Sequence, residues 1–195
     1  MVTAREIVNR YLCADIESRV DIVCRYYTQI DQIVDARISS ITYLIIEERH
    51  RARQAAYTEL GVRIQSGGEY SDPTADEAVT HADLESEIRE GYISNSFLEG
   101  IPRPEMIMLE VNAFLEMQRI RSLCDVEIRS LIGEDRELFS QYMTREMTIK
   151  EIASRCKIEY PSAVKRMSRI KRKVQHGVIE SLRDTSSTSC HAGTK

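Results

Sequence analysis

The sequence contains none of the short motifs that mark phosphate-binding loops or the common hydrolytic enzymes. Neither GxxxxGK[ST] nor GxGxxG occurs, and HExxH and GxSxG are missing too. The four histidines, at positions 50, 81, 176 and 191, do not pair with one another at the spacing of metal ligands. We therefore predict no enzymatic activity, no cofactor and no bound metal.

Cysteine is sparse, and its spacing argues against zinc or a disulfide framework. The five cysteines are an odd number, and no two of them form a CxxC pair. Cys13, Cys24 and Cys156 fall in stretches with a helical apolar pattern, which favours reduced and buried thiols. Cys190 and His191 are adjacent, but two ligands are too few for a metal site.

Long hydrophobic stretches are absent as well. The chain has no run of 18 apolar residues, so we expect no transmembrane span and no membrane partner. The first ten residues, MVTAREIVNR, lack the apolar core of a signal peptide. Together these absences predict a cytoplasmic protein.

Charge is distributed unevenly along the chain, whose net charge is −4. Residues 1–144 hold 15 Lys and Arg against 26 Asp and Glu, a net charge of −11. Residues 145–183 hold 11 Lys and Arg against 4 Asp and Glu, a net charge of +7. A small basic unit on an acidic body is a common arrangement in proteins that contact DNA.

Apolar residues at helical spacing predict an all-α fold, beginning with a helical region over residues 1–100. A capping box from Thr3 to Glu6 marks a helix start, and an apolar stripe follows from Ile7 to Leu60 without any proline or glycine. This pattern predicts one or two long helices. They either pack as a helical hairpin or form a coiled-coil seam through which the chain self-associates.

Glycine, proline and small polar residues divide the rest of the chain into further segments. The glycine-containing segment 61–72 predicts a loop, and an acidic helix over 73–92, with a second capping box at its start, should fold back on the long helix. We expect a C-terminal helical domain over 103–183, including a short helix near 125–132. The small, polar segment 184–195 is typical of a disordered tail.

Within the basic segment, the pattern predicts a short helix, a tight turn and a second helix. A capping box from Thr148 to Glu151 starts a helix over 148–156, and Pro161 marks the start of the next. Between them Ile158 is expected to plug the core, and the small Ala153 lets the second helix approach closely. The second helix has an apolar stripe at Ala163, Met167, Ile170 and Val174.

The rest of the second helix is polar and basic. On a helical wheel, Lys165, Ser168 and Arg172 point opposite the apolar stripe. Ser162, Arg169 and Lys173 flank one side, and Val164 and Lys171 flank the other. This arrangement predicts a helix-turn-helix over 148–176 whose second helix enters the major groove of DNA.

Residues 135–174 resemble the fourth conserved region of bacterial RNA polymerase sigma factors. The matching segments are DRELF (135–139), TIKEIA (148–153) and SAVKRMSRIKRKV (162–174). The resemblance implies a support helix, a positioning helix and a recognition helix, in that order. That family usually has glycine where Lys157 stands, and often where Glu146 stands, so Lys157 is expected to adopt a left-handed conformation.

The resemblance also implies which residues face DNA. Ser162, Lys165, Arg166 and Arg169 correspond to groove-facing positions or their neighbours, and Lys171, Arg172 and Lys173 to the basic tail of the recognition helix. The full set of expected DNA-contacting residues is Thr148, Tyr160, Ser162, Lys165, Arg166, Ser168, Arg169, Lys171, Arg172 and Lys173.

The order of elements along the chain is similar to that of phage sigma-like regulators, such as the ArpU and RinA late-gene regulator families and prophage positive-control factors. This implies a DNA-binding transcription regulator of phage or prophage type in the bacterial cytoplasm, at the nucleoid. Its expected partners are double-stranded DNA, RNA polymerase and a second copy of the chain. Two alternatives stay open: a helical protein-interaction module that does not bind DNA, and an accessory subunit of phage DNA packaging, similar to a small terminase.

Overall fold

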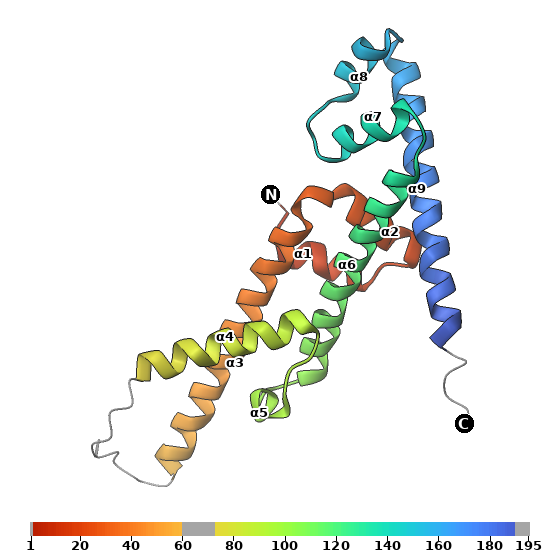
Figure 1. The fold of residues 1–195 in the computed structure, drawn as a ribbon. Helices are drawn as coiled ribbons and strands as arrows, with labels where there is room; N and C mark the ends of the chain where they lie inside the picture. Colours follow the sequence, from red (N-terminus) through yellow and green to blue (C-terminus); the bar gives the residue numbers. More distant parts are fainter. Residues whose placement is uncertain (1, 60–72, 190–195) are drawn as a thin grey trace. The chain divides into compact units, whose positions relative to one another are not determined.

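The computed structural model describes residues 2–59 and 73–189. Across these residues every element of regular structure is a helix, which confirms the predicted all-α class (Figure 1). Within the same ranges, no helix is both long and apolar enough to cross a membrane. The predicted loop at 61–72, and the side chains of the capping box expected at the start of the 73–92 helix, lie outside what is described.

The chain divides into two compact units that differ from the two predicted domains. One unit contains residues 1–31 together with 116–195, and the other contains residues 32–115. The predicted division was 1–100 against 103–183. The first 31 residues therefore group with the C-terminal helices, where α2 packs on α9.

The N-terminal pattern forms more helices than the one or two that we predicted. It contains α1 (Ala4–Leu12), α2 (Ile16–Arg25), a 3-10 turn (Tyr27–Gln29) and α3 (Ile30–Glu59). The Thr3 capping box is present as predicted. Asp15 then starts a new helix inside the continuous stripe, because its carboxylate accepts a hydrogen bond of 2.8 Å from the Ser18 amide.

The C-terminal elements also depart from two predicted boundaries. The helix α6 (Pro104–Ser130) is continuous, so no separate helix exists near 125–132. It is followed by α7 (Glu134–Met143), α8 (Ile149–Cys156) and α9 (Tyr160–Ser189). The disordered tail was expected to start at 184, whereas α9 continues to Ser189.

In the first unit the second half of α9 packs on α2. Its buried positions Val174, Val178 and Leu182 continue the apolar stripe of the first half. Two ion pairs join the same helices. The Lys171 ammonium lies 2.7 Å from Asp21, and Arg183 lies 3.0 Å from Glu17. The helix that carries the predicted recognition residues is thus held by the N-terminal segment of the chain.

The predicted burial of the cysteines is correct for only one of the three. Cys24 is buried, Cys156 is partly buried, and Cys13 is exposed. Cys13 is the residue that ends α1, where its amide donates to Asn9, and the chain turns outward there toward α2. Buried Cys24 on α2 faces buried Cys124 on α6, with 3.8 Å between their sulfur atoms.

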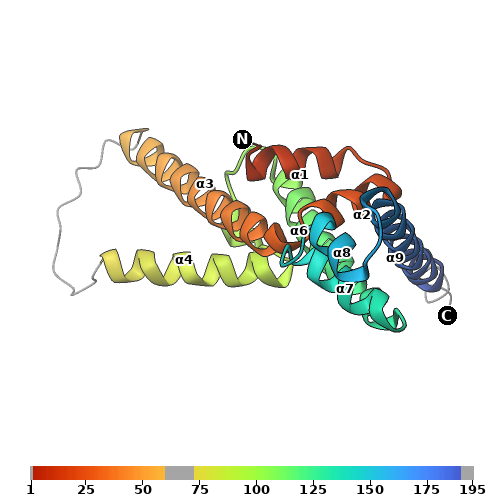
Figure 2. The ribbon, with the colours of Figure 1, turned by 90° about the horizontal axis from the view of Figure 1, so that it is seen from above.

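The second unit contains most of α3, the helix α4 (Pro73–Glu90), α5 (Asn95–Leu98) and the first part of α6. Arg89 of α4 pairs with Asp35 of α3 at 2.7 Å, and Glu85 accepts a 3.5 Å hydrogen bond from Ser39, so the C-terminal end of α4 lies beside the N-terminal end of α3. Figure 2 shows the two helices converging toward this end. Gly91 ends α4 with a positive φ of 89°.

Candidate nucleic-acid interface

The capping box that starts α8 is formed as the sequence predicts. The Thr148 hydroxyl accepts a hydrogen bond from the Glu151 amide at 3.4 Å, and the Glu151 carboxylate accepts one from the Thr148 amide at 2.7 Å. These bonds lower the pKa of Glu151, with the backbone bond from Thr148 as the largest cause. The Thr148 hydroxyl, which we expected to contact DNA, also donates to Glu151 and so belongs to the cap.

The turn between α8 and α9 depends on a left-handed residue. Lys157 has φ 52° and ψ 41°, which confirms the conformation expected from glycine at this position in the sigma-like pattern. The next amide, of Ile158, donates to the Ala153 carbonyl at 3.0 Å and closes the end of α8. Ile158 is partly buried, in keeping with its predicted role as a plug.

A second left-handed residue ends α7, one position away from the one that the pattern indicates. The sigma-like pattern often has glycine where Glu146 stands, but Arg145 is the residue with positive φ, at 63°. The Glu146 amide donates to the Gln141 carbonyl at 2.9 Å. The chain therefore reverses here with arginine in a conformation that usually favours glycine.

The apolar stripe of α9 is buried as predicted. Ala163 and Val174 are at most 1% exposed, and Met167 and Ile170 at most 5%. The stripe faces α8, which contributes Ile152 and the small Ala153, and α7, which contributes Leu138, Phe139 and Met143. This packing fixes the rotation of α9 about its axis, so it also decides which side chains point to solvent.

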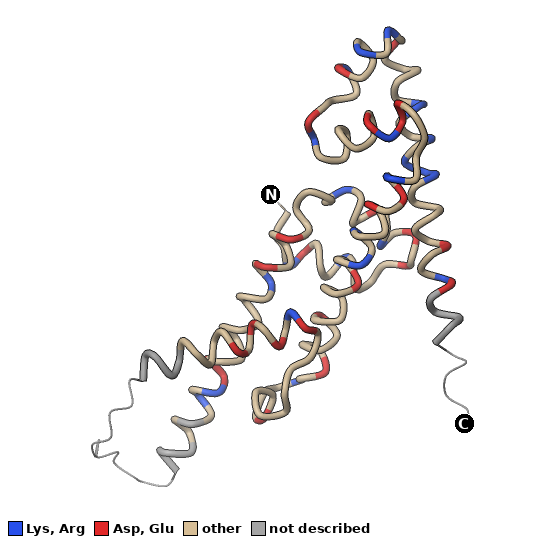
Figure 3. The backbone as a smooth tube through the Cα atoms, viewed as in Figure 1, with Lys and Arg blue, Asp and Glu red and all other residues tan. Residues whose placement is uncertain are grey.

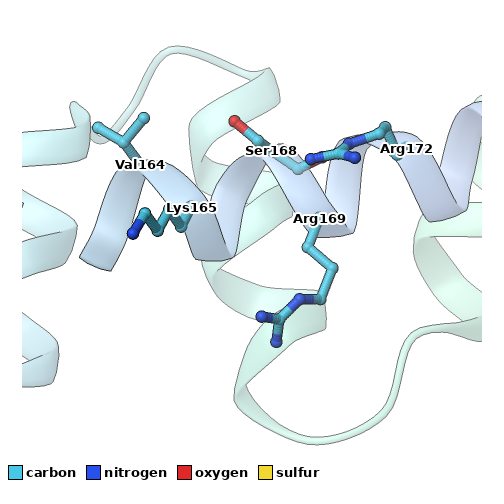
Figure 4. A pocket seen from close by; sticks show the side chains of 5 residues that line it. All are labelled: Val164, Lys165, Ser168, Arg169 and Arg172. Carbon is cyan, nitrogen blue, oxygen red and sulfur yellow. The ribbon is translucent and has the colours of Figure 1, made fainter. Parts of the chain in front are cut away.

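The opposite face of α9 is exposed and basic. Lys165, Ser168, Arg169 and Arg172, together with the partly buried Val164, line a shallow depression along the helix (Figure 4). Ser162 and Lys173 are exposed beside it, and Tyr160 is exposed at the helix start. None of the four cations Lys165, Arg169, Arg172 and Lys173 has an ion-pair partner within residues 2–59 and 73–189. Figure 3 shows the cationic positions that recur along this helix.

Arg166 is an expected DNA contact that the structure places elsewhere. Its guanidinium lies 2.6 Å from Asp135 and 3.6 Å from Glu134, at the start of α7. The hydrogen bond to Asp135 is the largest cause of a raised pKa for Arg166. This side chain joins α9 to α7 and is turned away from the exposed face.

Lys171 is the second such residue. Its ammonium is 2.7 Å from the Asp21 carboxylate of α2, which also accepts a 3.2 Å hydrogen bond from Gln175. Burial alone would raise the pKa of Asp21, but the bonds from Lys171 and Gln175 outweigh it and lower that pKa. Of the ten expected DNA-contacting residues, Arg166 and Lys171 thus form ion pairs with other helices, and the Thr148 hydroxyl caps α8.

Sequence reasoning missed the acidic partners of these cations and the apolar member of the exposed face. Asp135 and Glu134 lie in the first turn of α7. Acidic residues are common at this position because they interact favourably with the helix dipole, so their presence did not point to an ion pair with Arg166. Asp21 is separated from Lys171 by 150 residues, and nothing in its local sequence points to that pairing. Val164 was placed at the margin of the exposed face, although it lines the depression.

The site has the chemistry of a surface that binds an extended anion with hydrogen-bond acceptors. Ammonium and guanidinium groups supply only donors, and the serine hydroxyls supply both donors and acceptors. Such a set, on a helix narrow enough for the major groove, matches phosphate oxygens and the acceptor edges of bases. Comparison with known protein families, with curated proteins and with solved structures finds no match for this chain.

Proposed function

We propose that this protein is a sequence-specific, DNA-binding transcription regulator of phage or prophage type, in which α8, the Lys157 turn and α9 act as a helix-turn-helix. The observation that carries the proposal is the exposed face of α9. Its four cations have no ion-pair partner among the described residues, while the opposite face is buried against α7 and α8. Like charges three or four residues apart on one helix face repel each other by a few tenths of a kcal/mol, and a bound polyanion would replace this repulsion with attraction.

The position of each residue along α9 suggests its role on DNA. In this family of docking geometries the first turns of the second helix reach base edges, and later residues meet phosphates. Lys165, Ser168 and Arg169 would then read bases, with guanine as the preferred target of the two cations. Arg172 and Lys173, one turn later, would neutralise phosphates and contribute affinity without sequence preference.

The acidic body of the chain would help to orient the complex. Residues 1–144 carry a net charge of −11 and residues 145–183 a net of +7. Duplex DNA is repelled by the first and attracted by the second, so the encounter is steered toward α8 and α9. Binding of RNA polymerase near the promoter, and self-association, remain proposals for the rest of the chain.

Burial of the N-terminal apolar stripe bears on the proposed self-association. The apolar stripe of α1 to α3, from Ile7 to Ile45, is largely buried within one chain. It therefore leaves less surface for a second copy than we expected from the sequence. Light scattering on the full chain measures the oligomeric state independently of DNA.

DNA binding is tested with duplexes selected from random sequence and with scrambled controls. Lys165→Ala should cost about 1–3 kcal/mol on the selected duplex and much less on scrambled DNA, because it removes a base contact. Lys173→Ala should weaken both equally and reduce the slope of log K against log salt by about 0.9. The matched control is Arg10→Ala, an exposed cation on α1, which should leave both affinities unchanged.

Two outcomes would contradict the proposal. If the full chain binds no duplex even at low salt, the exposed face of α9 serves another purpose, and the protein-interaction module becomes the better account. If Arg10→Ala weakens binding as much as Lys165→Ala, binding is a response to total charge and not to the α9 surface. Equal losses on selected and scrambled DNA for Lys165→Ala would remove only its base-reading role.

A further inference from the structure

Two buried thiols face each other in the first unit. Cys24 on α2 and Cys124 on α6 are 7% and 0% exposed, and their sulfur atoms are 3.8 Å apart. They are 100 residues apart in sequence, so the tertiary fold brings them together. A disulfide has about 2.05 Å between its sulfurs, so bond formation must bring the two sulfur atoms closer by rotation of the side chains or by a shift of the helices.

We propose that Cys24 and Cys124 form a redox modification site, in which a hydroperoxide converts the two thiols into an intramolecular disulfide that joins α2 to α6. This inference does not depend on DNA binding. It concerns buried groups that the proposed function leaves unused.

The surroundings distinguish the two thiols. The hydrogen bond between the two thiols is the largest cause of a lowered pKa for Cys24, and the nearby Lys171 ammonium acts in the same direction against burial and Asp21. The pKa of Cys124 is raised by its bond to Cys24, by burial, and by Asp125 and Glu127. Cys24 is assigned as the nucleophile because it is the more exposed of the pair, and the lowered pKa acts in the same sense, since the thiolate is the reactive form.

The chemistry balances with the hydroperoxide as the only oxidant. The Cys24 sulfur attacks the O–O bond of hydrogen peroxide, which gives a sulfenic acid on Cys24 and releases one water. The Cys124 sulfur then attacks the Cys24 sulfur, its proton joins the departing hydroxyl, and a second water leaves. Two thiols are oxidised by two electrons, and one peroxide is reduced to two waters.

The bond would restrain the helix that supports α9. Cys24 follows Asp21 by three residues, so both lie on one face of α2, and Asp21 holds Lys171 and Gln175. A crosslink between residues so far apart in sequence restricts the unfolded chain strongly and so favours the folded state. The oxidised protein should accordingly melt at a higher temperature than the reduced one.

The experiment uses the full chain with the other three cysteines replaced, as Cys13→Ser, Cys156→Ser and Cys190→Ser. The folded protein is treated with hydrogen peroxide, digested without reductant and analysed by mass spectrometry. The expected product is a linked pair of peptides containing Cys24 and Cys124. Its melting temperature should rise by roughly 5–15 °C and return to the starting value with dithiothreitol.

The control variants are Cys24→Ser and Cys124→Ser in the same background, neither of which can form the crosslink or gain the peroxide-dependent rise. Because either change could weaken the core, their folding is checked by circular dichroism, and Cys24→Ala and Cys124→Ala replace them if needed. The inference is overturned if the two thiols stay free in the folded protein at peroxide levels that oxidise the exposed Cys13 of the unsubstituted chain. It is also overturned if the disulfide forms only in denaturant or lowers the melting temperature.

Discussion

At the scale of single residues, the basic side chains of this protein serve different purposes although their chemistry is alike. Arg166 and Arg169 are three positions apart on one helix. Arg166 pairs with Asp135 across the interface with α7, whereas Arg169 points to solvent without an ion-pair partner among the described residues. The two positions are only 60° apart around the helix axis, at 100° per residue, so the difference comes from the neighbouring helix α7, which presents Asp135 to Arg166.

Lys157 adopts a left-handed backbone conformation that is unfavourable for a residue with a Cβ atom. A left-handed conformation costs a lysine roughly 1 kcal/mol relative to glycine, because its Cβ approaches the following carbonyl. Lys157→Gly should therefore raise the stability of the protein by up to about 1 kcal/mol, measured as a higher midpoint in urea. Lys157→Ala is the matched control, because it removes the same charge but keeps the strain, and it should give no gain. A gain of equal size in both variants would attribute the effect to charge.

At the scale of elements, α8 is a short helix that depends on its ends. A helix of eight residues has few internal hydrogen bonds, so the capping box at Thr148 and the αL closure at Lys157 contribute a large share of its stability. Its remaining stability comes from packing Ile152 and Ala153 on α9. The orientation of the exposed face of α9 depends on the closure of both ends of α8 and on this packing.

Removal of the cap should therefore have a measurable effect. Thr148→Ala should destabilise the protein by about 1 kcal/mol, because the Glu151 amide loses its acceptor. The control is Ser154→Ala in the same helix, where the hydroxyl only bonds back to the Lys150 carbonyl. That control should be neutral or slightly stabilising. Equal urea midpoints for Thr148→Ala and the wild type would show that the capping box does not limit stability.

At the scale of the whole molecule, the two ends of the chain belong to one unit. The second half of α9 buries Val178 and Leu182 against the N-terminal segment, and two ion pairs cross the same junction. The C-terminal segment that we predicted as a separate domain thus lacks part of its core when it is isolated.

A fragment of residues 103–195 tests this. It should melt at a lower temperature than the full chain, and hydrogen exchange should be fastest in the second half of α9, because α2 is missing. Addition of a peptide of residues 1–31 should restore part of the protection. A fragment that melts like the full chain, with equally protected amides in α9, would show that the N-terminal segment is dispensable.

The same junction predicts a pH dependence. The folded pKa of Asp21 lies below its ordinary value of 3.8, so on acidification the unfolded chain takes up the proton first. The stabilisation from Asp21 is therefore complete well above pH 3.8 and is lost as the pH falls through the folded pKa. Asp21→Asn should lower stability at pH 7 by up to about 1 kcal/mol, since the Lys171 pair is partly exposed.

The difference in unfolding free energy between wild type and Asp21→Asn should shrink as the pH falls below 3.8, measured by urea unfolding at each pH. A suitable control is Asp83→Asn, which changes an exposed carboxylate on α4 that has no ion-pair partner among the described residues. It should produce a smaller change at pH 7. A difference for Asp21→Asn that persists unchanged at pH 2 would mean that the Asn side chain disturbs packing and that the ion pair is not the cause.

The sequence by itself determined the features that depend on neighbours within about four residues. The capping boxes at Thr3 and Thr148 and the buried stripe from Ala163 to Val174 are of this kind, whereas the left-handed Lys157 was expected only from the resemblance to the sigma pattern. Helix caps and helix faces are set by i to i+3 and i to i+4 contacts, so the residues that form them are adjacent in the sequence. The same locality explains why the exposed residues of α9 could be identified in advance.

Only the tertiary structure decided which of those cations are available. Arg166 meets its partner 31 residues away and Lys171 meets its partner 150 residues away. Cys24 and Cys124 meet across 100 residues. The hydrophobic effect is not directional, so an apolar helix face could pack on many different partner helices. The periodicity of the sequence therefore shows which face of a helix is buried, but it does not show which other helix covers that face. For that reason the N-terminal stripe, which in sequence suits a second chain, is covered largely within its own.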